Sequence, residues 1–150
     1  QLSGMTSASM PTGSVLQVVQ ATSITEATST STTFADYDLT ASLTPTSTSS
    51  KILVMITLAG ILKKNANNLS KHRVVRGAST VISAWNNLSP YNNTTDRESD
   101  QMSINYLDSP ATTSSTSYKV QFCLYSGATG DTLIGNNSSM STMTLMEIAG

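Results

Sequence analysis

Apolar and polar residues alternate along several stretches of the chain, and this period of two is typical of β-strands that bury one face. Between residues 33 and 43 the apolar set is Ala35, Tyr37, Leu39, Ala41 and Leu43, and the polar set is Asp36, Asp38, Thr40 and Ser42. Between 117 and 125 one face carries Tyr118, Val120, Phe122 and Leu124, opposite Lys119, Gln121 and Cys123. Both stretches predict strands with one face in a core.

Further strands are predicted at 14–22, 51–62, 101–107 and 140–149, and the stretch 72–85 divides into two short strands joined at 76–79. No segment of ten or more residues has the period of a helix. Seven or eight strands linked by Ser, Thr, Asn and Gly turns predict an all-β fold: an antiparallel β-sandwich, Greek-key or jelly-roll-like. We expect one domain over 14–150, preceded by a linker or extended lead-in at 1–13.

The stretch 52–59 departs from this alternation because only Thr57 interrupts its apolar run. A strand that is apolar on both faces needs cover on both, and in a sandwich the core covers one of them. Either a loop or a neighbouring copy of the chain covers the other, as in symmetric oligomers. Which face belongs to the core stays open, and the residues expected at an oligomer interface are Ile52, Val54, Met55, Ile56 and Leu58.

Charge is scarce: charged residues make up 11% of the chain, and the formal net charge is −1. This balance gives no long-range field to attract nucleic acid or an anionic membrane, so neither is an expected partner. The longest apolar run, 52–62, is too short to insert across a bilayer, and residues 1–20 lack the features of a secretion signal. Because the sequence begins with Gln1, we expect a fragment or processed product of a larger parent.

Residues that perform chemistry are few. His72 is the only histidine, it is flanked by Lys71 and Arg73, and we expect it in a solvated loop or at a strand end rather than in a catalytic arrangement. The single Cys123 is expected to be a small apolar strand residue. One Cys and one His cannot complete a metal shell, so we expect no cofactor and no enzyme activity.

Two charged clusters have a plain interpretation and a functional one. The acidic stretch 92–100, with Asp96, Glu98 and Asp100, is interpreted as a solvated polar loop, in preference to a cation site or a pair of catalytic carboxylates. The basic set is interpreted as a solvated hairpin in preference to a phosphate-binding surface; it comprises Lys63, Lys64, Lys71, Arg73 and Arg76. Gly127, Gly130 and Gly135 are expected in turns.

The loop after Trp85 is the best candidate for recognition. It combines Trp85 and Tyr91 with Asn92 and Asn93, and aromatic faces with amide donors and acceptors suit contact with a cell-surface glycan. In the alternative interpretation, Trp85 ends a strand and fills the core while the Asn residues form turns.

Several segments together resemble a domain common in marine and cyanobacterial tailed-phage genomes. They are "PTGSVLQVVQATS", "SLTPTSTSSKILVMITLAG", "HRVVRGAST", "YLDSPATTSSTSYKVQF" and "STMTLMEIAG", in the same order over most of 11–150. The resemblance implies the C-terminal β-sandwich domain of a fibre or appendage, a homotrimer, with itself and other virion proteins as partners. The chain departs from the family at 61–69 and 89–100, and no catalytic residues are implied.

These observations favour a virion structural module, a distal tail-fibre or spike domain used in host attachment. The alternative is a capsid decoration or head-fibre protein, which the sequence does not separate from the first. A glycan-degrading enzyme is disfavoured by the scarcity of acids and the single histidine.

Overall fold

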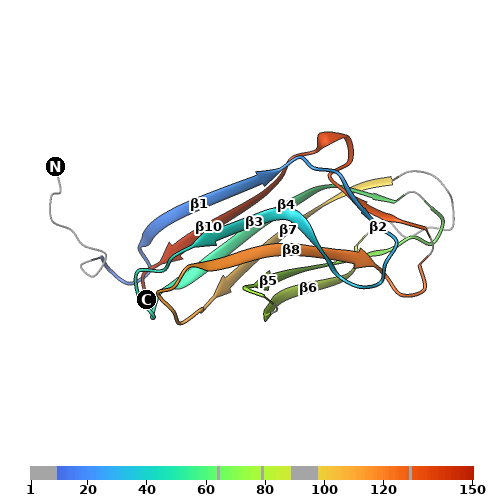
Figure 1. The fold of residues 1–150 in the computed structure, drawn as a ribbon. Helices are drawn as coiled ribbons and strands as arrows, with labels where there is room; N and C mark the ends of the chain where they lie inside the picture. The colour runs from blue at the N-terminus through green and yellow to red at the C-terminus, as the bar shows by residue number, and fades with distance from the viewer. Residues whose placement is uncertain (1–9, 64, 79, 89–97, 129) are drawn as a thin grey trace.

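Two antiparallel β-sheets packed face to face make up the molecule (Figure 1). The computed structural model describes residues 10–63, 65–78, 80–88, 98–128 and 130–150. These residues contain ten strands and one short 3-10 turn at Asn136–Ser138. The predicted all-β antiparallel sandwich is confirmed.

The larger sheet is built around β4 (Lys51–Lys63), the longest strand. Its main part has the strand order β1–β10–β4–β7, with bounds β1 Val15–Ser23, β10 Ser141–Ile148 and β7 Glu98–Asp108. The far end of β4 also pairs with β9 (Thr132–Ile134), which in turn pairs with β2 (Ala27–Ser29).

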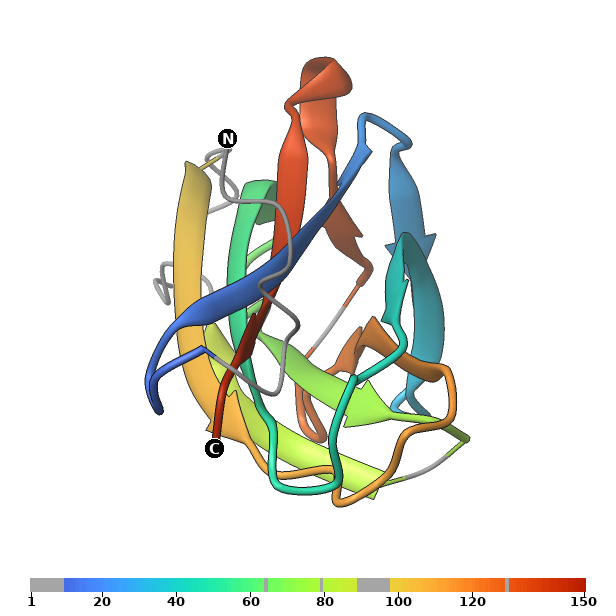
Figure 2. The same ribbon diagram turned by 90° about the vertical axis from the view of Figure 1, so that its left-hand side faces the viewer.

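The smaller sheet has the order β3–β8–β5–β6. Its bounds are β3 Ala35–Leu43, β8 Thr116–Leu124, β5 Ser70–Arg76 and β6 Thr80–Leu88. The chain crosses between the sheets at most connections, so each sheet is assembled from strands that are distant in sequence. Figure 2 shows the two layers from the end that carries the C-terminus.

The core lies between the sheets and is filled by the inward residues of both. From β3 these include Tyr37, Leu39, Ala41 and Leu43, as the alternation predicts, whereas Ala35 at the start of the strand is exposed. Tyr37 meets Phe122 edge to face with ring centroids 6.2 Å apart, and its hydroxyl donates to the carbonyl of Thr25 at 3.0 Å. Cys123 is buried in β8, as expected of a small apolar strand residue.

Two strands, β2 and β9, were not predicted. Each has three residues, too few to show a period of two, and they pair with each other. The strand predicted at 101–107 also begins earlier, at Glu98. The interpretation of 92–100 as a polar loop is therefore wrong for Glu98 and Asp100, which pair with Lys63 and Ile61 of β4.

The run at 52–59 follows ordinary alternation in the folded chain. Ile52, Val54, Ile56 and Leu58 belong to the core of the single chain, with exposed fractions of 0–2%. They are therefore not available to a second copy, and their assignment to an oligomer interface is wrong. Of the five residues expected at an oligomer interface, only Met55 lies on the outer face of β4. It is half-buried there, as is Leu53 on the same face.

His72 is not solvated. It lies inside β5 between two neighbouring strands and is fully buried, stacked on Phe122 with ring centroids 6.5 Å apart. The expectation of a loop or strand-end residue is wrong because β5 extends on both sides of it, from Ser70 to Arg76. Gly127, Gly130 and Gly135 do lie outside the strands at positive φ, as turn residues.

The two ends of the sandwich differ in what they present. The Ala149 N–H donates to the Ser14 carbonyl at one end, where β1 begins and β10 finishes (Figure 1). The strand ends at Leu88 and Glu98, which flank 89–97, lie at the opposite end. In the part of the chain that the structure describes, no helix has the length and apolar character needed to cross a membrane.

Candidate functional site

The outer face of the larger sheet is the candidate functional site. Strand pairing places its residues in rows across β1, β10, β4 and β7. The first row is Val18, Met146, Leu53 and Leu107; the second is Gln20, Thr144, Met55 and Asn105; the third is Thr22, Thr142, Thr57 and Ser103. We call these three rows the neutral face, because none of their residues carries a charge.

The first row of the neutral face is an apolar band across all four strands. Its two outer residues are open to solvent in the single chain, with exposed fractions of 54% for Val18 and 49% for Leu107. Met146 and Leu53 between them are half-buried. In the second row, Gln20 donates to the hydroxyl of Thr144 at 3.2 Å, and Met55 continues the apolar surface. A contiguous apolar band on one sheet face is typical of a contact surface.

The outer face of the smaller sheet has the opposite character. Asp36 accepts hydrogen bonds there from Lys119 at 2.6 Å and from Gln121 at 2.5 Å. Gln121 in turn accepts from Arg73 Nε at 2.7 Å, and the Arg73 guanidinium lies 4.1 Å from the centroid of the Phe34 ring. The Lys119 hydrogen bond, followed by that of Gln121, lowers the pKa of Asp36 from its ordinary value. This face is therefore charged and suited to water.

The basic residues predicted to form a solvated hairpin are mostly engaged with other side chains. Arg73 is held as just described, and Lys71 lies 4.9 Å from the centroid of the Tyr125 ring. Arg76 is partly buried and bonds to Asp108 through Nη1, at 2.8 Å to Oδ1 and 2.7 Å to Oδ2. Tyr118 donates its hydroxyl to the same carboxylate at 2.7 Å. The side chain of Lys63 and all of residue 64 lie outside the described part.

A buried carboxylate in the last strand binds the first strand and the connection between β3 and β4. Glu147 is fully buried in β10 and accepts hydrogen bonds from Gln17 Nε2 at 2.6 Å and from the backbone N–H and hydroxyl of Thr46 at 2.6 and 2.7 Å. Burial acts to raise the pKa of Glu147, but these hydrogen bonds outweigh it and hold the pKa below its ordinary value. The connection 44–50 is thereby fixed to the last strand.

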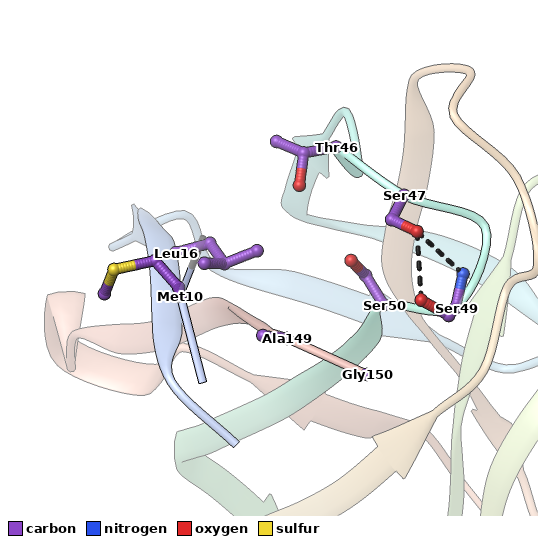
Figure 3. Close-up of a pocket in the computed structure, with 8 residues that line it drawn as sticks. All are labelled: Met10, Leu16, Thr46, Ser47, Ser49, Ser50, Ala149 and Gly150. Carbon is purple, nitrogen blue, oxygen red and sulfur yellow. Dashed lines mark hydrogen bonds between the residues drawn. The ribbon is translucent and has the colours of Figure 1, made fainter. Parts of the chain in front are cut away.

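A pocket of about 370 Å³ lies beside this connection (Figure 3). It is lined by Met10, Leu16, Thr46, Ser47, Ser49, Ser50, Ala149 and Gly150. Ser47 and Ser49 bond to each other there, with 2.9 Å between their hydroxyl oxygens and 3.2 Å from the Ser49 N–H to Ser47 Oγ. These contacts close a local turn. We therefore attribute the pocket to the way the segment around Met10 and Leu16 packs against the 44–50 connection.

The residues predicted to contact a glycan fall largely outside the described part of the chain. Tyr91, Asn92 and Asn93 are among the residues not described, as is Asp96. Trp85 lies in β6, opposite His72 of β5. The backbone thus places Trp85 within a strand, and its contact with a glycan stays a prediction.

Metal-ligating side chains do not gather among the described residues. No group of three or more His, Cys, Asp or Glu side chains with metal-binding geometry is found among them. Ser70 Oγ lies 2.8 Å from His72 Nε2, which resembles a nucleophile–base pair, but both residues are fully buried. Burial lowers the pKa of His72 to about 4, so the imidazole is neutral at pH 7 and forms part of the packing.

Glu147 was not predicted from the sequence, and neither were the contacts of Asp108 with Arg76 and Tyr118. The alternation of buried and exposed positions in the two strands could have indicated both Glu147 and Asp108. Glu147 occupies the same phase as Met143 and Leu145, and Asp108 the same phase as Met102 and Ile104. A charged residue in the buried phase of a strand requires partners, and these two have them.

Comparison with solved structures finds chains of similar fold. No protein-family model and no curated protein matches the chain. A solved structure described as "Structure of infectious bursal disease virus Gx strain" is similar, with a TM-score of 0.46 and 14% sequence identity. The match covers 89% of this chain and 32% of that chain, so this chain spans about a third of that protein's length. A likeness of this size does not indicate a function.

Proposed function

We propose that the chain is a structural component of a phage virion that assembles as a homotrimer through the neutral face. The neutral face is the observation that carries the proposal. When copies of an uncharged surface meet, no like charges are brought together and no ion loses its hydration, whereas the charged face of the smaller sheet would incur both costs.

The arrangement of strands supports a virion role. The orders β1–β10–β4–β7 and β3–β8–β5–β6 are those of a jelly roll, in which the eight strands of two Greek keys form two four-stranded sheets. This architecture is frequent in viral capsid and lectin domains. Because a fold hosts many functions, the virion location and the number of three copies rest on the resemblance of the sequence to phage fibre domains.

Within the virion, a distal tail-fibre or spike domain used in host attachment is the first choice. The strand ends that flank 89–97 lie at the end opposite Ser14, so a parent attached through Ser14 would present these strand ends outward. Binding residues tend to collect in connections held on a rigid scaffold. A capsid decoration or head-fibre protein is the second choice, since it would use the same neutral face.

The proposed role is not enzymatic and requires no cofactor. The Ser70–His72 pair cannot meet a substrate because both side chains are fully buried. Glu98 and Asp100 belong to the edge strand β7 rather than to a cleft between two acids.

The assembly test uses charges placed where the single chain tolerates them. Val18→Asp and Leu107→Asp introduce a carboxylate at solvent-exposed positions of the neutral face and should leave the fold intact. Val81→Asp is the matched control, because Val81 is 45% exposed but lies on the smaller sheet. Light scattering should give the mass of three chains for the unchanged protein and the control, and of one chain for the two variants. A folded monomer at micromolar concentration in the unchanged protein would refute the proposal.

The attachment test is separate. The domain should compete with phage for host cells, and Tyr91→Ala combined with Asn92→Ala and Asn93→Ala should abolish competition while the trimer persists. Undiminished competition by that trimeric variant would remove the connection 89–97 from the receptor site.

A further inference from the structure

A second pocket, of about 350 Å³, opens where β5 turns into β6 and where the connection 109–115 leads into β8. It is lined by Arg76, Gly77, Ala78, Thr80, Pro110, Thr112, Ser115, Thr116 and Ser117. Most of these residues carry a hydroxyl, one carries a guanidinium, and the volume is that of a site for a small ligand. We infer that this pocket binds a hexuronic acid, with the sugar carboxylate on Arg76 and the ring hydroxyls against the Ser and Thr side chains.

The Arg76 guanidinium is held in place through one of its nitrogens. Nη1 is bonded to both oxygens of Asp108, and Asp108 is kept in position by the hydroxyl of Tyr118. Both hydrogen bonds to Asp108 come from Nη1, so Nε and Nη2 take no part in that contact, and the Arg76 side chain is 26% exposed. These two nitrogens form the side edge of the guanidinium, whose parallel N–H groups match the two oxygens of a carboxylate.

The hydroxyls around Arg76 are available to a ligand. Thr80, Ser115 and Ser117 donate no side-chain hydrogen bond to any described residue. A hydroxyl both donates and accepts, so a set of them suits the hydroxyls of a sugar better than it suits a simple anion. Asp108 already balances the charge of Arg76, and the hydroxyl contacts must therefore supply part of the affinity.

The wall formed by 109–115 is fixed before any ligand arrives. Thr112 Oγ1 accepts from the Ser114 N–H at 3.0 Å, and the Thr116 hydroxyl donates to the Ser114 carbonyl at 3.1 Å. Ala111 is held at a φ of 52°, a left-handed conformation that costs a residue with a Cβ about 1 kcal/mol or more. Such costs persist where the surroundings determine the backbone, and a preformed wall reduces the ordering that binding requires.

The pocket is distinct from the neutral face and from the strand ends at Leu88 and Glu98. It lies at the end of the sandwich where β5 finishes and β8 begins, on the side of Ser14. Binding therefore does not require the proposed trimer, and the two proposals fail separately.

The test is titration of the ¹⁵N-labelled chain with glucuronate, glucose and acetate, followed by amide chemical shifts. Glucuronate should give saturable shifts at Gly77, Thr80 and Ser115, and glucose and acetate should each bind at least tenfold more weakly. Arg76→Lys keeps the cation but removes the Nε–Nη2 edge, and it should weaken glucuronate binding at least tenfold.

A variant that leaves the Arg76–Asp108 contact untouched covers the case in which Arg76→Lys fails to fold. Thr80→Phe fills the pocket and should abolish binding, whereas Thr40→Phe, the same change on the outer side of β3, should not. The Val18→Asp chain should bind as the unchanged chain does. Equal binding of glucose and glucuronate, no saturable shifts, or full binding by folded Thr80→Phe would each overturn the inference.

Discussion

The backbone N–H of Thr46 donates a hydrogen bond of 2.6 Å to Glu147, which lies 101 residues further along the chain. The Thr46 hydroxyl and Gln17 Nε2 bind the same carboxylate. One buried acid therefore joins the first strand, the connection between β3 and β4, and the last strand. The hydroxyl-rich stretch 44–50 is thus tied to the last strand through this acid.

Glu147→Gln should destabilise the fold by about 2 kcal/mol, because the amide keeps the shape but cannot accept the same three charge-assisted bonds. The lowered pKa of Glu147 also predicts a pH dependence. Its stabilising contribution is present above the ordinary value of 4.5 and is lost as the pH falls below it. Urea unfolding between pH 7 and pH 3 measures both effects. The exposed Glu26→Gln is the control, and equal stability of the two variants would contradict the prediction.

His72 should give a pH dependence in a higher window. Its pKa is lowered by burial from 6.5 to about 4, so the unfolded chain binds a proton at pH values where the folded chain does not. The corresponding stability is complete above pH 6.5 and declines as the pH falls toward 4. His72→Gln, which cannot titrate, should flatten the stability profile in that window and leave the loss caused by Glu147 in place. An unchanged slope just below the ordinary histidine pKa would show that His72 is not the group responsible.

Gly60→Ala and Gly77→Ala distinguish the backbone strain that a Cβ causes at positive φ from its steric clash with neighbouring atoms. Both glycines have positive φ, 65° and 61°, so both variants lose roughly 1 kcal/mol to the left-handed conformation. At Gly77 a Cβ meets nothing within 4 Å, whereas at Gly60 it would lie 2.5 Å from the backbone nitrogen of Asn136. Thermal unfolding should therefore show a clearly larger loss for Gly60→Ala. Equal losses would mean that the segment around Asn136 moves aside freely.

Tyr118→Phe removes the hydroxyl that donates to Asp108 and should cost about 1–2 kcal/mol. Burial, followed by the Asp108 carboxylate, raises the pKa of Tyr118 well above its ordinary value of 10.0. The neutral phenol therefore stabilises the fold below that value, and this contribution is lost as the pH rises above it. Urea unfolding at alkaline pH should show that the variant loses stability less steeply than the unchanged chain. If both chains lost stability at the same rate in that range, the result would count against this role.

Alternation in the sequence was sufficient to locate the main strands, because β3 buries one face from Tyr37 to Leu43 and β8 alternates between buried and half-buried residues from Thr116 to Val120. It was insufficient for β4, since Leu53 and Met55 make both of its phases apolar. The inward phase is set by pairing with β10 and β7, and pairing is not visible in one sequence. His72 was misplaced for a related reason: Val74 and Val75 are both buried, so the phase of β5 cannot be read.

The candidate site was harder to predict than the strands. The neutral face combines residues from four strands, and each strand contributes only one apolar residue to the first row. The overlooked feature of the sequence was a charged residue at a strand position that alternation assigns to the buried face. Glu147 and Asp108 sit in the buried phases of β10 and β7, where only a partnered charge is tolerated.

The pairing of β1 with β10 determines how the domain would respond to mechanical load. Its register runs from Val15 opposite Ile148 to Ser23 opposite Ser141, and the interstrand hydrogen bonds lie perpendicular to the strands. A pull between Ser14 and the strand ends at Leu88 and Glu98 acts along β1, so it loads these bonds together in shear. A pull that separates Ser14 from Ala149 at their shared end would instead break the same bonds one after another, starting from that end. The domain should therefore resist tension along its length much better than tension applied across its two termini.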